Sequence, residues 1–163
     1  ELVEQLCEIA WEGVDAVAVA VGGGGLISGI ATWLARSAPE ARVIGAQPAA
    51  DAAMAASVEA GRIVEVAARP TLSHSTAGGI EAGALTFDVY RERVSEWVRV
   101  EEDAIADAVR RMLLDEHQLV EGAAGVALAA AAAYARREPE ARVAAVSCGA
   151  RLTPTELESV LAA

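Results

Sequence analysis

The most informative absence from this sequence is lysine. All 13 basic residues in the chain of 163 are arginine. A reaction that needs a lysine amine as nucleophile or base therefore cannot obtain it from this chain. Only two cysteines are present, Cys7 and Cys148, and they lack the spacing of a zinc site. This usage favours a reducing compartment and predicts no metal site.

Membrane and nucleic-acid partners are also disfavoured. No apolar run reaches the ~20 residues that a membrane-spanning helix needs. The net charge of −11 opposes binding to the phosphates of nucleic acid. We expect a cytoplasmic, globular protein, since no signal peptide is present. The chain starts at Glu1 inside a predicted helix, so we expect residues 1–163 to be a piece of a longer polypeptide.

Helical and strand patterns alternate along the chain, which predicts an α/β fold with a doubly wound parallel sheet. Residues 67–83 are rich in Ser, Thr, Gly and Pro and predict an ordered functional loop. The predicted helices cover residues 2–12, 26–37, 51–60, 84–94, 101–117, 121–137 and 153–162. The predicted strands cover residues 14–21, 62–66 and 96–100, with a further strand between two proline stops within 39–48 and a last strand that runs into a loop within 141–150.

Four consecutive glycines stand out in VGGGGLISGIA, residues 21–31, between a predicted strand and a predicted helix. In a doubly wound sheet, ligands bind at the carboxyl ends of the strands. A glycine turn at this place exposes successive backbone N–H groups, and the helix after it adds the positive end of its dipole. The stretch therefore predicts an anion site suited to phosphate.

Three kinds of phosphate site use such a turn. A P-loop requires Gly-Lys-Ser/Thr, but Leu26, Ile27 and Ser28 follow the glycines. A dinucleotide fingerprint requires a third glycine where Ile27 or Ser28 stands, and an acidic residue where Gln47 stands. A single phosphate monoester on the glycine backbone fits best, and a tight turn without a ligand is the alternative.

The glycine stretch and five further segments, all in order, resemble the fold-type-II pyridoxal-phosphate (PLP) enzymes of the threonine/serine dehydratase family. The segments are RVIGAQP (42–48), STAGGIEAGALTF (75–87), VEEDAIADAVRRML (100–113), EGAAGVALAA (121–130) and AVSCGAR (145–151). The STAGG and EGAAGVA forms are most similar to the ectoine-utilisation dehydratase branch. The resemblance implies that residues 1–163 form the C-terminal part of the large, PLP-binding domain, of the tryptophan-synthase-beta type.

The resemblance also implies a cofactor, PLP, and residues that bind it. Cys148 aligns with the family's Ser or Cys that bonds the pyridine nitrogen, although a small buried apolar role is the alternative. Glu121 is expected to line the pocket, or else to serve only as an acid at a helix N-terminus. The remaining implied residues are the phosphate-binding backbone of Gly22, Gly23, Gly24, Gly25 and Leu26, and the pocket glycines Gly78 and Gly79.

This sequence departs from the family in four respects. Two are local: the family's ADG is Ala77-Gly78-Gly79 here, and its final Gly-Gly-Asn is Gly149-Ala150-Arg151. The other two concern a metal and the catalytic lysine. Some members bind a cation through a Glu and an Asp, but Gln47 and Ala53 occupy those positions, so we expect no metal. The family's PLP-binding lysine lies in an N-terminal segment that is absent here, as is the small domain. The chain alone is therefore expected to be inactive.

The resemblance implies a parent lyase that converts a β-hydroxy amino acid to a 2-oxo acid and ammonia. Its substrate is expected to be a small amino acid, and the full-length enzyme is expected to form a homodimer. Racemases share these motifs, so the reaction stays open between dehydration and racemisation. The alternatives are a non-catalytic relic or regulatory partner that keeps a phosphate-binding fold, and a nucleotide-binding α/β module.

Overall fold

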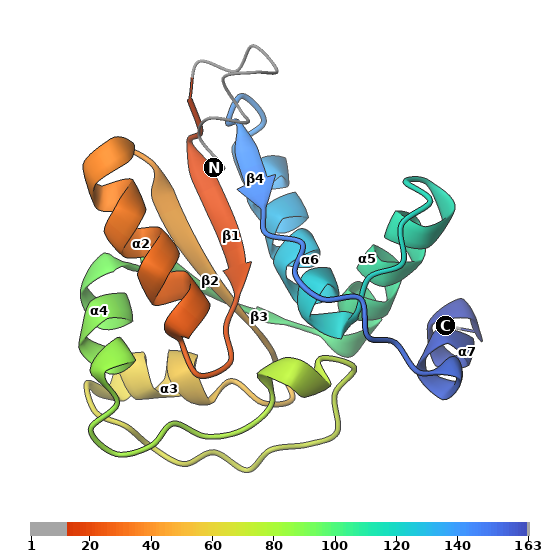
Figure 1. Cartoon of the computed structure of the whole chain (residues 1–163), viewed down its shortest axis with the longest axis horizontal. Coiled ribbons are helices and arrows are strands. Elements are labelled where there is room, and N and C mark those ends of the chain that lie inside the picture. Colours follow the sequence, from red (N-terminus) through yellow and green to blue (C-terminus); the bar gives the residue numbers. More distant parts are fainter. Residues whose placement is uncertain (1–12, 163) are drawn as a thin grey trace.

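We describe residues 13–162 in a computed structural model of the chain (Figure 1). The helix predicted over residues 2–12 lies outside the described residues. All the remaining predicted elements are present except the strand over residues 62–66. In chain order they are β1 (Ala16–Ala20), α2 (Gly25–Ser37), β2 (Arg42–Pro48), α3 (Ala53–Ala60), the 3-10 turn η1 (His74–Thr76), α4 (Leu85–Arg93), β3 (Glu96–Val100), α5 (Glu102–Leu114), α6 (Gly122–Arg137), β4 (Val143–Ala145) and α7 (Pro154–Ala162).

The strands form a four-stranded parallel sheet in the order β3-β2-β1-β4. β1 lies in the interior of this sheet, with Val17 opposite Val43 of β2 and opposite Ala144 of β4. Its run of valine and alanine is entirely buried. A strand buried on both faces reads as a continuous apolar run, which is why the sequence shows no alternation here.

Helices cover both faces of the sheet, as a doubly wound fold requires (Figure 1). Val17 and Val19 of β1 pack with α2 and α4 on one face. Ala16, Ala18 and Ala20 pack against the alanine-rich α6 on the other. The sequence-level prediction of an α/β fold with a parallel sheet is therefore confirmed.

Among the described residues, one predicted strand is absent, and one helix is shorter than predicted. The strand predicted over residues 62–66 is wrong: the N–H of Val64 donates to Ser57 Oγ, and no strand pairs with this segment within the described residues. The helix predicted to reach residue 117 ends at Leu114, three residues before His117, which has a positive φ of 55°. The last strand, predicted to run into a loop within residues 141–150, covers Val143–Ala145, and the chain after it enters the site.

Among residues 13–162, none of the helices combines the length and the apolar character needed to cross a bilayer. The sequence TPTE at residues 153–156 predicts a capped start of the last helix, with Thr as the cap, Pro at the first helical position and Glu at the third, and this prediction is confirmed. The N–H of Glu156 donates to Thr153 Oγ1, and the N–H of Thr153 donates to Glu156 Oε2, which is a reciprocal capping box.

Candidate cofactor-phosphate site

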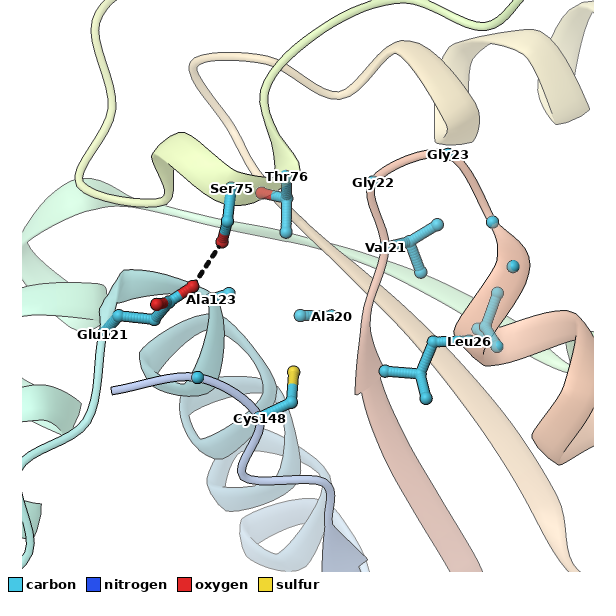
Figure 2. A pocket seen from close by; sticks show the side chains of 14 residues that line it. Ala20, Val21, Gly22, Gly23, Leu26, Ser75, Thr76, Glu121, Ala123 and Cys148 are labelled. Atoms are coloured by element: carbon cyan, nitrogen blue, oxygen red, sulfur yellow. Dashed lines mark hydrogen bonds between the residues drawn. The ribbon is translucent and has the colours of Figure 1, made fainter. Parts of the chain in front are cut away.

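The glycine loop, defined as residues 22–25, follows β1 directly and leads into α2 at the carboxyl end of the sheet. It forms one wall of a pocket of about 340 Å³ (Figure 2). The predicted residues Leu26, Glu121 and Cys148 line the same pocket. Segments about 100 residues apart in the sequence are thus brought to one site, as a topological switch between β1, β2 and β4 allows.

The backbone of the glycine loop is rich in unpaired donors. Within residues 13–162, the N–H groups of residues 22–27 donate to no protein acceptor. They stand at the N-terminus of α2, a helix of 13 residues whose dipole adds positive potential at this end. Free N–H groups and a helix N-terminus beside a pocket can hold the oxygens of a phosphate.

Gly24 gives the loop its bend and contacts the ring of Tyr90. Its φ is +83°, a left-handed conformation that side chains rarely adopt. A Cβ at this position would lie 2.8 Å from Cε1 of Tyr90, so only glycine fits. Burial raises the pKa of Tyr90 to about 12, and its hydroxyl donates to Met54 Sδ at 3.1 Å. The buried Tyr90 therefore supports the loop from outside the pocket.

Glu121 connects two chain segments in the pocket wall that faces the glycine loop. Its Oε1 accepts a hydrogen bond from Ser75 Oγ at 2.6 Å, drawn in Figure 2, and its Oε2 accepts from the N–H of Arg151 at 3.0 Å. Glu121 precedes α6 but makes no side-chain bond to the first turn of that helix. Instead, it connects η1 to the segment after β4, so it does more than serve as a helix N-terminal acid.

Cys148 follows β4, and Figure 2 shows its side chain pointing into the pocket. Burial raises the pKa of the Cys148 thiol, and the negative charge of Glu121 raises it further. The thiol is therefore neutral at pH 7 and offers a weak donor and acceptor. The next residue, Gly149, has a φ of +87° and packs against the Glu121 carboxylate, which fixes this turn.

The two glycines predicted in the long loop do not line this pocket. The N–H of Gly78 donates to Asp51 Oδ2 at 2.7 Å, which anchors the loop at the end of β2 instead. Gly79 is exposed. Sequence reasoning missed Ser75 and Thr76, which do line the pocket. The only signal for them was the hydroxyl-rich stretch within the STAGG segment.

Gln47 is fully buried and makes hydrogen bonds with both ends of its amide. Nε2 donates to the carbonyl of Val21 at 3.1 Å, and Oε1 accepts from the N–H of Ala55 at 2.9 Å. Within the part of the chain that the structure describes, no three His, Cys, Asp or Glu side chains are grouped to hold a metal ion.

The fold and the pocket define an α/β protein with a pocket at the carboxyl end of a parallel sheet, bordered by backbone N–H groups that have no protein acceptor among the described residues. Comparison with known families is more specific, because residues 1–149 match the family described as "Pyridoxal-phosphate dependent enzyme". The chain belongs to this family, whose members use pyridoxal phosphate, and the resemblance seen in the sequence is confirmed.

Similar proteins include threonine ammonia-lyases. L-threonine ammonia-lyase of Thermotoga maritima is 41% identical over 117 residues, which are 72% of this chain and 29% of that protein. The structure of processed threonine deaminase isoform 2 from Solanum lycopersicum superimposes with a TM-score of 0.86 at 29% identity, over 96% of this chain and 46% of that one. The structure of maize serine racemase superimposes with a TM-score of 0.83 at 26% identity, over 99% of this chain and 49% of that one. The chain thus spans less than half the length of these relatives.

The residues present fit the phosphate of this cofactor. The loop leaves its N–H groups free, and a Cβ at Gly23 or Gly25 would meet no atom within 4 Å, so the backbone borders open space. The neutral Cys148 thiol lies in the same pocket and suits an unprotonated ring nitrogen.

Proposed function

We propose that this chain is the cofactor-phosphate part of a PLP-dependent dehydratase that acts on a small β-hydroxy amino acid. The observation that carries the proposal is the row of free N–H groups at residues 22–27, in one pocket with a neutral thiol. The threonine ammonia-lyase relatives support this class of reaction.

The proposed roles divide between the two walls of the pocket. The backbone of Gly22, Gly23, Gly24, Gly25 and Leu26 holds the phosphate. Cys148 faces the ring and bonds its nitrogen without donating a full proton, since its thiol pKa is raised. PLP, when bound, withdraws electrons from the α-carbon of an amino acid. Glu121 holds Ser75 and the backbone of Arg151 in place at the wall of the cofactor pocket.

The chain has no lysine, so the proposal assigns covalent attachment of the cofactor and the main proton transfer to another part of the parent polypeptide. Residues 1–163 are then the C-terminal part of the large domain, inactive alone. A cytoplasmic location and a homodimeric parent remain predictions.

The test is an assay of the parent polypeptide that contains this chain. With L-serine or L-threonine it should release a 2-oxo acid and ammonia, and borohydride should fix the cofactor to a lysine outside residues 1–163. Formation of the D-amino acid without 2-oxo acid would instead assign racemisation. A parent with no reducible cofactor and neither product would support the non-catalytic relic.

A further inference from the structure

Two backbone carbonyls, one just before the glycine loop and one within it, accept hydrogen bonds from side chains that lie outside the pocket. Gln47 Nε2 donates to the carbonyl of Val21 at 3.1 Å, and Thr86 Oγ1 donates to the carbonyl of Gly23 at 3.0 Å. The Gln47 amide cannot be reversed, because its Oε1 must accept from the N–H of Ala55. The carbonyls of Val21 and Gly23 are therefore fixed by side chains, and the carbonyl of Gly24 accepts from the N–H of Ser28 at the start of α2.

Each fixed carbonyl also sets the direction of the next N–H group. All peptide bonds described are trans, so the N–H of a peptide points opposite to its C=O. The carbonyl of Val21 points toward Gln47 on β2, so the N–H of Gly22 points to the other side of β1. That side holds β4 and, after it, Cys148 in the pocket.

The same argument applies two peptide planes further on, at the peptide that joins Gly23 to Gly24. Thr86 belongs to α4, which packs beside α2 and contributes no residue to this pocket. The carbonyl of Gly23 points to Thr86, so the N–H of Gly24 points away from α4. The remaining polar groups at the loop do not supply this orientation, since Tyr90 directs its hydroxyl to Met54.

We propose that Gln47 and Thr86 are positioning residues that orient the N–H groups of Gly22 and Gly24 toward the phosphate. This inference rests on the proposed function for the identity of the anion. The orientation itself is a property of the free chain. Gln47 is suited to this role because an amide donates and accepts at once, whereas a carboxylate at position 47 has no proton to donate to the carbonyl of Val21.

The test replaces Thr86 with Val, which keeps the shape and removes the hydroxyl, and with Ser, which restores the hydroxyl. Pyridoxine 5′-phosphate is the probe, because it carries the phosphate but no reactive aldehyde. Thr86→Val should weaken its binding about fivefold, the effect of one lost hydrogen bond, and Thr86→Ser should recover most of the loss. Ser57→Ala is the control, because it removes a buried hydroxyl that bonds Ala53 and Val64, away from the loop.

A second readout measures orientation directly in the free chain, through residual dipolar couplings of backbone N–H groups. The Gly24 vector should change in Thr86→Val and the Gly22 vector in Gln47→Met, and neither should change in Ser57→Ala. Unchanged vectors in both variants would overturn the positioning roles. A parent chain that binds no phosphate ester would overturn the proposed function instead, and the couplings would still decide the positioning.

Discussion

Ser75 Oγ lies 2.6 Å from Glu121 Oε1 and donates a hydrogen bond to it, which ties η1 to the start of α6 at the pocket wall. The same carboxylate accepts from the N–H of Arg151 and raises the pKa of Cys148. One carboxylate thus holds two chain segments and influences the thiol between them.

Glu121→Gln should lower the pKa of the Cys148 thiol while leaving it above that of a free cysteine. Burial is the larger cause of the raised pKa and stays, whereas the charge of Glu121 is removed. The measurement is the rate of iodoacetamide alkylation of Cys148 against pH, with Cys7 replaced by Ser in both proteins. An alkylation profile that does not move toward lower pH would contradict the electrostatic role of Glu121.

Gly24→Ala should destabilise the chain by about 2–4 kcal/mol, the sum of a left-handed residue with a Cβ and an overpacked contact. The backbone at position 24 has a φ of +83°. A Cβ added there would lie 2.8 Å from Cε1 of Tyr90. Gly23→Ala is the matched control, because a Cβ there meets nothing within 4 Å. Urea denaturation measures both, and equal free energies of unfolding for the two variants would refute the account of Gly24.

Asp15→Asn should lower stability at pH 7 and lose this effect in acid. Hydrogen bonds from Arg142 hold the pKa of Asp15 below its usual value. A depressed pKa in the folded state stabilises the chain above the unfolded pKa of about 3.9, and this contribution is lost as pH falls through the folded pKa. Urea denaturation at pH 7 and near pH 3 should show that the difference in unfolding free energy between variant and parent is smaller in acid.

The exposed ion pair of Asp88 with Arg91 provides the control for this prediction. Asp88→Asn should change stability little at either pH, because exposed pairs contribute little. A constant gap between Asp15→Asn and its parent from pH 7 to pH 3 would show that the Asp15 carboxylate has no such role.

Arg110→Met should loosen the last helix, α7. Arg110 donates from Nε and Nη2 to the carbonyl of Val160, at 3.0 and 2.8 Å. Amide hydrogen exchange of residues 154–162 should accelerate by about tenfold, since charged hydrogen bonds of this kind are among the stronger ones. Arg111→Met is the matched control, because Arg111 is exposed and pairs only weakly with Asp115 on its own helix. Equal exchange in the two variants would exclude a role for Arg110 in docking α7.

Local patterns predicted the elements that depend on local causes. The apolar run of β1, the glycine loop and the capping box at Thr153 and Glu156 were all predicted from a few adjacent residues. The false strand over residues 62–66 has the apolar composition of a strand but pairs with no strand among the described residues, and the N–H of Val64 donates to Ser57 Oγ instead. Pairing is a property of the whole sheet and cannot be deduced from five residues.

For the candidate site too, local sequence predicted the glycine loop, whereas contacts between distant segments could not be predicted from it. The glycine loop was predicted as an anion site from its own residues, but its meeting with Glu121 and Cys148 was implied by the family resemblance. Ser75 and Thr76 reach the pocket through the turn η1, and Gly79 does not, although only a few residues separate them. Which residue of a 17-residue irregular segment faces a pocket depends on tertiary contacts, here those of Asp51 with Gly78 and Glu121 with Ser75.

The central claim is that the backbone of residues 22–26 holds the phosphate of the cofactor. The most direct measurement is a titration of the isotope-labelled chain with pyridoxine 5′-phosphate and, separately, with pyridoxine, following the backbone amide resonances. The account predicts saturable shifts of the amides of Gly22 to Leu26 with the phosphate ester and none of comparable size with pyridoxine. Equal shifts with both compounds, or shifts confined to other residues, would contradict it.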